Sequence, residues 1–175
     1  IENPKENVLQ RIVFKHRRKD VYLVADAYRG IKIKETINDF VAAASGEKLE
    51  NVEVGDKTLQ ILGSADIISF VGHNGLMDFK LDKKIVKKDD DERQAVILAC
   101  ASRQYFAEHL KQTSAKPLLW TSNLMAPEAY ILHDAFEGWV RGESDEQIRT
   151  HAARAYSKYQ RISLRSAKRL LVTGW

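Results

Sequence analysis

Two short apolar runs in the middle of the chain each end in a chemically reactive side chain. Residues 67–71 lead through Gly72 into His73, and residues 95–99 lead into Cys100. Runs rich in Val, Ile and Phe predict buried strands, and residues just past the carboxyl ends of parallel strands line the binding crevice of an open α/β sheet. We therefore expect the two strands to be neighbours, with His73 and Cys100 at one edge of the sheet.

Along the rest of the chain, the apolar pattern predicts strands that alternate with helices. Further strands are expected at 21–27, 117–122 and 170–173, helices at 34–44, after Ser102, from Pro127 to Gly142 and after Ser144, and a hairpin or extended arm within 47–66. Alternating strands and helices imply a mostly parallel central sheet covered on both faces. The predicted fold is a three-layer α/β/α sandwich that forms a single domain over residues 1–175.

Local signals sharpen the expected ends of the helices. Ser102 is a candidate N-cap, Pro127 suits a first helical turn, and residues 144–147 read as a capping box that opens a long helix with Tyr159 on its inner side. The charged stretch 80–94 predicts a surface loop, and exposed polar loops are preferred sites of proteolytic nicking.

Length and composition exclude several classes of protein. A chain of 175 residues can bury a substantial core without disulfides or metal, and a single Cys rules out an intramolecular disulfide and a CxxC zinc site. The five His residues show no HExxH spacing, so we predict neither a metal nor a cofactor. No apolar stretch approaches the length of a membrane span. The chain begins with Ile1 and carries no signal-peptide pattern, which leaves both a cytoplasmic and an exported location open.

The net charge of +4 comes largely from residues 15–19 and the last forty residues of the chain. Exposed aromatic residues do not interleave with these cations, and no nucleic-acid motif accompanies them. We therefore interpret them as a solvated basic face and predict no nucleic-acid partner. The sequence does not indicate an oligomeric state.

A thiol beside an imidazole is the minimum equipment for nucleophilic acyl transfer, because the base converts the thiol into the reactive thiolate. The alternative is that Cys100 is an inert core residue, since free cysteines are among the most buried residues. Glycines around His73 favour the first interpretation, because they suit a turn in which backbone approaches a ligand.

The pattern of an apolar strand ending in His with a nearby Gly, followed by an apolar strand ending in Ala-Cys and a small residue, resembles the caspase-like superfamily of cysteine peptidases. The similarity covers residues 20–175 in element order, and its specific part is about fifteen residues around the two motifs. This resemblance implies hydrolysis of peptide bonds in a peptide or protein substrate by a His–Cys dyad.

Under this resemblance, Cys100 is the nucleophile, and His73 is the general base that later protonates the leaving amine. The amides of Cys100 and of Asn74 or Gly75 would stabilise the oxyanion. The resemblance requires no third residue, but Asp66 and Asp78 lie close to His73 in the sequence and are candidates to orient its ring. The alternative is that both are solvated turn residues.

Residues at the same rim are candidates for substrate binding. Asp26 and Arg29 follow the predicted strand at 21–27, and they could instead pair with each other across the turn. Trp120 and Ser122 lie at the end of the predicted strand 117–122 and are the better candidates for pocket walls, although Trp120 also suits simple core packing.

Two departures from the family pattern keep a second function open. Asn74 separates His73 from Gly75, where the family places Gly directly after the His. The family also places two strand–helix units before the His-bearing strand, whereas this sequence predicts one, at 21–45. Either the first unit lies upstream of Ile1, or the basic arm replaces it. The alternative function is a catalytically inactive caspase-like domain that acts as a protein-interaction module.

Overall fold

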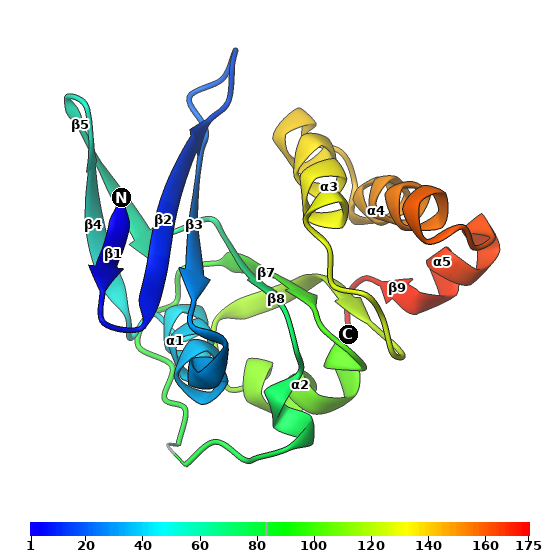
Figure 1. Ribbon diagram of the computed structural model, residues 1–175, viewed down its shortest axis with the longest axis horizontal. Coiled ribbons are helices and arrows are strands. Elements are labelled where there is room, and N and C mark those ends of the chain that lie inside the picture. The colour runs from blue at the N-terminus through cyan, green and yellow to red at the C-terminus, as the bar shows by residue number, and fades with distance from the viewer. Residues whose placement is uncertain (83) are drawn as a thin grey trace.

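The two apolar runs form adjacent parallel strands in the computed structural model, which describes residues 1–82 and 84–175. They are β6 (Ile67–Val71) and β7 (Arg93–Leu98), and they belong to a sheet with the order β6-β7-β8-β9 (Figure 1). Strand β8 (Ala115–Thr121) runs parallel to β7, and the short β9 (Leu171–Val172) runs antiparallel to β8. The predicted adjacency of the two strands is confirmed, and the protein is mixed α/β with one mostly parallel main sheet.

Strand β7 is buried on both of its faces, which explains its unbroken apolar sequence. Ala95 and Ile97 belong to one core cluster, which is shared with residues of α1 (Ile33–Ala44) and α2 (Ser102–Leu110). Val96 and Leu98 belong to a second cluster, which is shared with residues of α3 (Ala129–Arg141) and α4 (Asp145–Gln160). Successive side chains of a strand point to opposite faces, so each cluster takes every second residue of β7.

The strand predicted at 21–27 exists, but it does not belong to the main sheet. It is β3 (Tyr22–Tyr28), which pairs antiparallel with β2 (Val8–Lys15), and β2 in turn pairs with β1 (Glu2–Lys5). A 3-10 turn, η1 (Gly30–Lys32), links β3 to α1. The expectation that this strand lies in the parallel sheet is therefore wrong. Gln10 and Arg11 interrupt the apolar residues of its partner β2, which therefore carries no strong strand signal.

The predicted hairpin within 47–66 is confirmed as β4 (Leu49–Val54) and β5 (Lys57–Leu62). An ionic network joins it to the N-terminal sheet. Arg11 on β2 is only 4% exposed, and its guanidinium binds Asp26 on β3 and Glu50 on β4. Charge-assisted bonds of this kind satisfy a buried guanidinium, which would otherwise be costly to remove from water.

The surface loop predicted at 80–94 is found over the described residues of 80–92, whereas 93 and 94 belong to β7, and its C-terminal end is fixed to the core. Between Phe79 and Glu92, the described residues form no helix or strand. Arg93, which opens β7 and is almost fully buried, binds the Asp89 carboxylate with Nη1 at 2.9 Å and Nη2 at 3.0 Å. The same guanidinium donates to the carbonyl oxygens of Ala44 and Gly63, so one side chain joins the loop, α1 and the end of the hairpin.

Two predicted helix starts are displaced. The N-cap of α2 is Ala101, in a left-handed conformation with φ of 48°, whereas Ser102 is the first helical residue and donates its buried hydroxyl to the Ile97 carbonyl at 2.8 Å. Helix α3 begins at Ala129, so Pro127 lies before its first turn. The capping box at Ser144 is confirmed, and α3 ends as predicted at Gly142, which the structure shows as a C-cap in the left-handed conformation.

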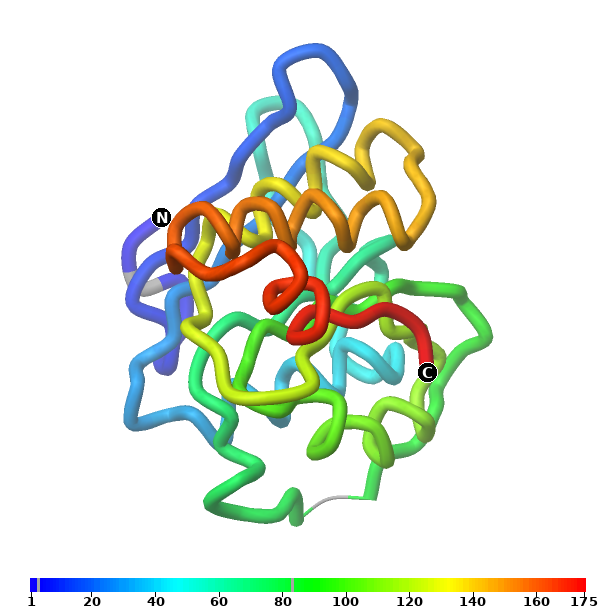
Figure 2. The backbone as a smooth tube through the Cα atoms, turned by 90° about the vertical axis from the view of Figure 1, so that its right-hand side faces the viewer, coloured from blue at the N-terminus to red at the C-terminus, as the bar shows by residue number. Residues whose placement is uncertain are grey.

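The C-terminal region contains a helix that the apolar pattern did not reveal, α5 (Leu164–Leu170), which packs against α4 on the side facing the viewer in Figure 2. Helix α4 ends at Arg161, which adopts a left-handed conformation without the glycine that normally signals such an end. Tyr159 does not point inward as expected. It is 55% exposed, and its ring stacks on that of Tyr130 at a centroid distance of 4.3 Å.

Candidate functional site

The loops that follow β6 and β7 lie side by side at one end of the main sheet. The register pairs Val71 with Leu98, and the Gly72 amide extends it by donating to the Leu98 carbonyl at 3.1 Å. His73 and Cys100 each follow within two residues of these positions. The sheet therefore brings the two predicted catalytic residues to the same edge.

Asn74, the residue that departs from the family pattern, connects these two loops. Its side chain is fully buried, and Nδ2 donates to the Cys100 carbonyl at 2.6 Å. Its Oδ1 accepts a hydrogen bond from the Leu76 amide at 3.1 Å, which caps the short 3-10 turn η2 (Gly75–Met77). A carboxamide suits this position because it donates and accepts at once. The sequence drew attention to Asn74, but it did not reveal this bridging role.

His73 is exposed, and its ring is oriented by a carboxylate. Its Nε2 lies 2.6 Å from Oδ2 of Asp78. A proton on Nε2 leaves Nδ1 as the basic nitrogen of the neutral imidazole. The other predicted candidate, Asp66, precedes β6 and therefore lies at the opposite end of that strand from His73. Of the two carboxylates, the structure places Asp78 against the ring.

The Cys100 thiol is half-buried and is bonded to the backbone of Met125. Sγ donates to the Met125 carbonyl at 3.3 Å and accepts from the Met125 amide at 3.4 Å. No hydrogen bond joins Sγ to His73 within the described part of the chain. The segment 122–126 is itself fixed, since Asn123 accepts a bond from the Ala101 amide and the Ala126 amide donates to the Tyr156 hydroxyl. No sequence signal pointed to Met125.

The three backbone amides proposed for the oxyanion site differ in their availability. The Gly75 amide already donates to the His73 carbonyl at 3.1 Å. Across residues 1–82 and 84–175, the amides of Asn74 and Cys100 donate to no protein acceptor. An oxyanion binds best to donors that are fixed in place before it forms. Of the predicted set, Asn74 and Cys100 are therefore the two amides that could serve.

Asp26 and Arg29 do not meet the site in the way the sequence suggested. The expectation placed them at its rim because it put their strand in the parallel sheet. Asp26 instead accepts bonds from Arg11 Nε at 2.6 Å and Nη2 at 2.7 Å. Burial opposes ionisation of Asp26, but Arg11 and Lys5 outweigh it, and the pKa of the carboxyl falls below its usual value. Arg29 is exposed and bonds to the Glu6 carbonyl, so the two residues do not pair with each other.

The two candidates for pocket walls, Trp120 and Ser122, have different surroundings in the structure. Trp120 is 1% exposed, its Nε1 donates to the Gly174 carbonyl at 3.0 Å, and its ring meets that of Trp175 edge-on. It therefore belongs to the core and not to an open pocket. Ser122 is exposed, but its hydroxyl donates to the Arg169 carbonyl at 2.7 Å, which fixes the start of the segment 122–126 against α5.

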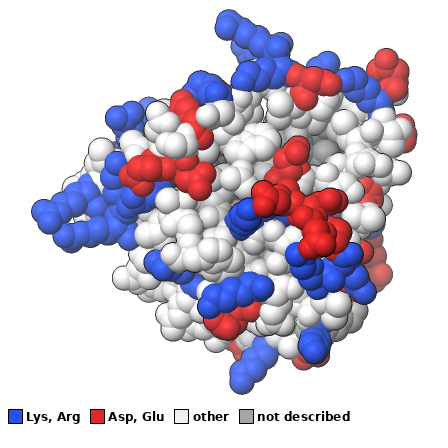
Figure 3. All heavy atoms as spheres, turned by 180° about the vertical axis from the view of Figure 1, so that it is seen from behind, with Lys and Arg blue, Asp and Glu red and all other residues white. Residues whose placement is uncertain are grey.

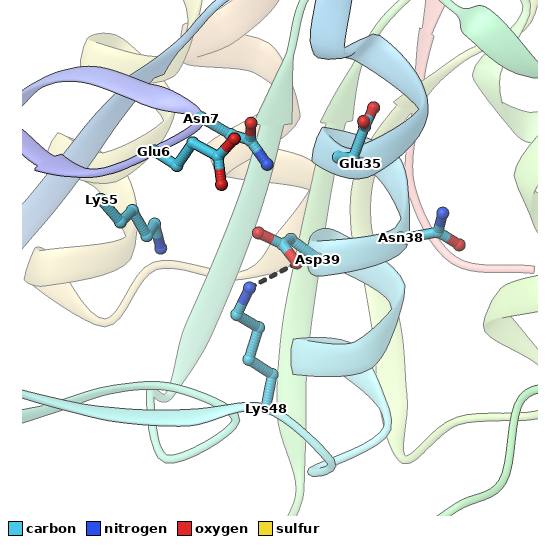
Figure 4. A pocket seen from close by; sticks show the side chains of 7 residues that line it. All are labelled: Lys5, Glu6, Asn7, Glu35, Asn38, Asp39 and Lys48. Carbon is cyan, nitrogen blue, oxygen red and sulfur yellow. Dashed lines mark ion pairs between the residues drawn. The ribbon is translucent and has the colours of Figure 1, made fainter.

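A separate hollow of about 360 Å³ lies between the β1–β2 turn, α1 and the start of β4 (Figure 4). Its lining contains both signs of charge, and Lys48 is paired with Asp39 within it. Lys5 is bound by Asp26 and Glu50. Because both of its cations are neutralised, and because its elements carry neither His73 nor Cys100, we do not assign this hollow to the candidate site.

Among residues 1–82 and 84–175, no group of three His, Cys, Asp or Glu side chains is placed to hold a metal ion. None of the helices in the same residues is long and apolar enough to cross a membrane. Comparisons of the chain with protein-family models, with curated proteins and with solved structures each returned no match.

Proposed function

We propose that this protein hydrolyses peptide bonds with a His73–Cys100 dyad on a caspase-like, three-layer α/β/α fold. The observation that carries the proposal is the hydrogen bond from Asn74 Nδ2 to the Cys100 carbonyl, at 2.6 Å, which ties together the loops that bear the two residues. The parallel register of β6 and β7 supports it, because it sets both loops at one edge of the sheet. The resemblance of the two motifs to the caspase-like superfamily supplies the expected reaction.

In the proposed reaction, Nδ1 of His73 removes the proton from the Cys100 thiol, while Asp78 holds Nε2. The thiolate attacks the carbonyl carbon of the substrate, and the amides of Cys100 and Asn74 stabilise the resulting oxyanion. His73 then returns the proton to the leaving amine, and a water molecule hydrolyses the thioester. The Cys100 side chain must first leave Met125, because a thiolate cannot donate to a carbonyl oxygen.

A second candidate function rests on the bond from the Cys100 thiol to the Met125 carbonyl. In the observed arrangement, the thiol donates to the Met125 carbonyl and the Gly75 amide is already occupied. Both features favour a domain that has lost catalysis and serves in protein interaction. The two functions differ in the chemistry that they require of the thiol.

The rate of alkylation of the Cys100 thiol distinguishes the peptidase from the inactive interaction domain. For an active dyad, we expect Cys100 to react with iodoacetamide at neutral pH faster than a model thiol, because an adjacent imidazole increases the thiolate fraction. His73→Ala should remove that advantage, and Asp78→Asn should reduce it, with Cys100→Ser as the blank. Cleavage of a fluorogenic peptide library by the wild type and not by Cys100→Ser would then give the activity itself.

A thiol that reacts no faster than a free one, and that is unaffected by the loss of His73, would contradict the peptidase function. Glu108→Gln is a suitable control for Asp78→Asn. It removes one carboxylate from an exposed ion pair on α2, between Lys111 and Glu108, that does not include His73 or Cys100. Equal effects of the two substitutions would show that Asp78 acts only through general surface charge.

A further inference from the structure

The C-terminal helix and the last strand form a shallow groove of about 540 Å³ on the surface. Its lining combines four cations with two apolar side chains: Arg149, Leu164, Arg165, Lys168, Arg169 and Val172. The groove belongs to elements that the proposed catalytic residues do not use. Figure 3 shows Lys and Arg side chains gathered at the left-hand edge, which corresponds to the edge formed by α4 and α5 at the right of Figure 1.

Two of the four cations are part of the framework of the groove. Arg149 donates through Nε to the Leu171 carbonyl at 2.7 Å, and its Nη2 donates to the Lys168 carbonyl. Glu146 neutralises part of this charge, since it lies 2.6 Å from Arg149 and 3.5 Å from Lys168. These contacts fix α4, α5 and β9 relative to one another, so the groove exists before any partner binds.

The other two cations are available to a partner. Arg165 and Arg169 are both exposed, and no ion pair of the described residues includes either of them. They are four residues apart on α5, which places their side chains on one side of the helix. Arg169 and Arg165 thus present two guanidinium groups beside the apolar side chain of Leu164, which is 39% exposed.

From this arrangement, we infer that the α5–β9 groove binds an acidic peptide segment that carries an apolar residue among its carboxylates. Guanidinium groups match carboxylates in geometry and charge, and Leu164 and Val172 offer contact to an apolar side chain. A nucleic acid fits less well. A helix of seven residues is only about 10 Å long, the lining contains no aromatic ring on which a base could stack, and duplex-binding proteins commonly contact six to ten phosphates. The inference does not depend on the peptidase function.

The test is a binding titration that needs no activity. The probe is a fluorescein-labelled peptide, Glu-Glu-Leu-Glu-Glu-Val-Glu-Glu, titrated with the Cys100→Ser protein and followed by fluorescence anisotropy. We expect the double substitution Arg165→Ala with Arg169→Ala to weaken binding about twofold to thirtyfold, the range for the loss of two exposed ion pairs. Binding should also weaken as the salt concentration rises.

The matched control is Arg17→Ala with Arg18→Ala, at the exposed turn between β2 and β3, which removes the same two charges from the net of +4. This control should bind the peptide like the parent protein. Equal weakening by both double variants would overturn the inference, because it would show a response to net charge alone. Circular dichroism and urea unfolding of each variant exclude loss of the fold as the cause.

A second probe distinguishes the class of partner. An oligothymidylate of matched charge should bind more weakly than the peptide, and Leu164→Ser should weaken binding of the peptide about twofold to fivefold without changing that of the oligonucleotide. Tighter binding of the oligonucleotide, or a peptide affinity unaffected by Leu164→Ser, would overturn the assignment to an acidic peptide. None of these outcomes bears on whether Cys100 is catalytic.

Discussion

The stability of the loops at the candidate site depends on one buried carboxamide, and this dependence can be measured. Replacing Asn74 by Ala removes the bond from Nδ2 to the Cys100 carbonyl and the bond from the Leu76 amide to Oδ1. A buried polar group left without its partner costs about 1–3 kcal/mol. Because Cys100 is half-buried, water can satisfy part of the loss at its carbonyl.

We therefore expect Asn74→Ala to lower the free energy of unfolding by about 3 kcal/mol. For a chain of this size, each kcal/mol shifts the thermal midpoint by about 2–4 °C, so the midpoint should fall by about 6–12 °C. Urea unfolding followed by circular dichroism gives the free energy directly, provided that the slope against denaturant is unchanged.

Asn123→Ala is the matched control at the same edge of the sheet. Asn123 also accepts a hydrogen bond from a backbone amide, that of Leu124 at 2.7 Å, but its side chain is exposed. Water can replace that bond, so the expected loss is less than about 1 kcal/mol. If Asn74→Ala costs no more than Asn123→Ala, the assigned role of Asn74 is wrong.

Asn74→Asp tests the direction of the hydrogen bond. An ionised carboxylate still accepts from Leu76, but it can only repel the Cys100 carbonyl, whereas a protonated carboxyl donates to it. Burial and this contact should raise the folded-state pKa of the new carboxyl above its unfolded value of about 3.9. The deficit relative to the wild type should therefore be smallest below about pH 4 and should grow as the pH rises. A deficit that does not vary with pH would contradict this geometry.

Two further predictions concern the ionic contacts. Arg93→Ala should lower the free energy of unfolding by about 3–5 kcal/mol, because it leaves the Asp89 carboxylate and the buried carbonyls of Ala44 and Gly63 without their donor. The control is Lys116→Ala, which breaks an exposed pair with Glu92 and should cost less than about 1 kcal/mol. Urea unfolding measures both. Hydrogen bonding from Arg11 lowers the pKa of Glu50, so its stabilising contribution is present above its unfolded pKa and is lost as the pH falls through the folded value. As the pH is lowered from about 6 to about 3, the urea midpoint should therefore fall less steeply for Glu50→Gln than for the wild type.

The parts of the fold that could be predicted from the sequence are those in which burial is complete. Residues 95–98 are apolar without interruption because both faces of β7 are covered, and consecutive buried strands are usually neighbours in a sheet, so the adjacency of β6 and β7 could be predicted. The half-exposed N-terminal sheet gave no such signal. Residues 22–28 read as a core strand, although their partner β2 holds them through an ion pair from Arg11 as well as through apolar contacts.

The C-terminal helix was missed for a local reason. Arg161 ends α4 in a left-handed conformation that sequence reasoning expects from Gly or Asn, so no sequence signal marked a break before a further helix. At the candidate site, the sequence predicted that His73 and Cys100 lie at one edge of the sheet because each closely follows a buried strand. It could not reveal the contact of Cys100 with Met125, which depends on how the segment after β8 folds back against the loop after β7.

The two contacts of the Cys100 residue also differ in strength, and this difference bears on the proposed function. The bond from Asn74 to the Cys100 carbonyl involves a fully buried side chain and a strong acceptor, so it should persist in any active conformation. The bonds of Sγ to Met125 involve a weak donor and a weak acceptor at 3.3 and 3.4 Å. Giving them up should cost about 1 kcal/mol or less, a cost that substrate binding can offset. The proposed activity therefore requires a rotation of the Cys100 side chain away from Met125, while the bond from Asn74 holds the backbone in place. Rapid alkylation that depends on His73 would show that this rotation occurs in the free protein.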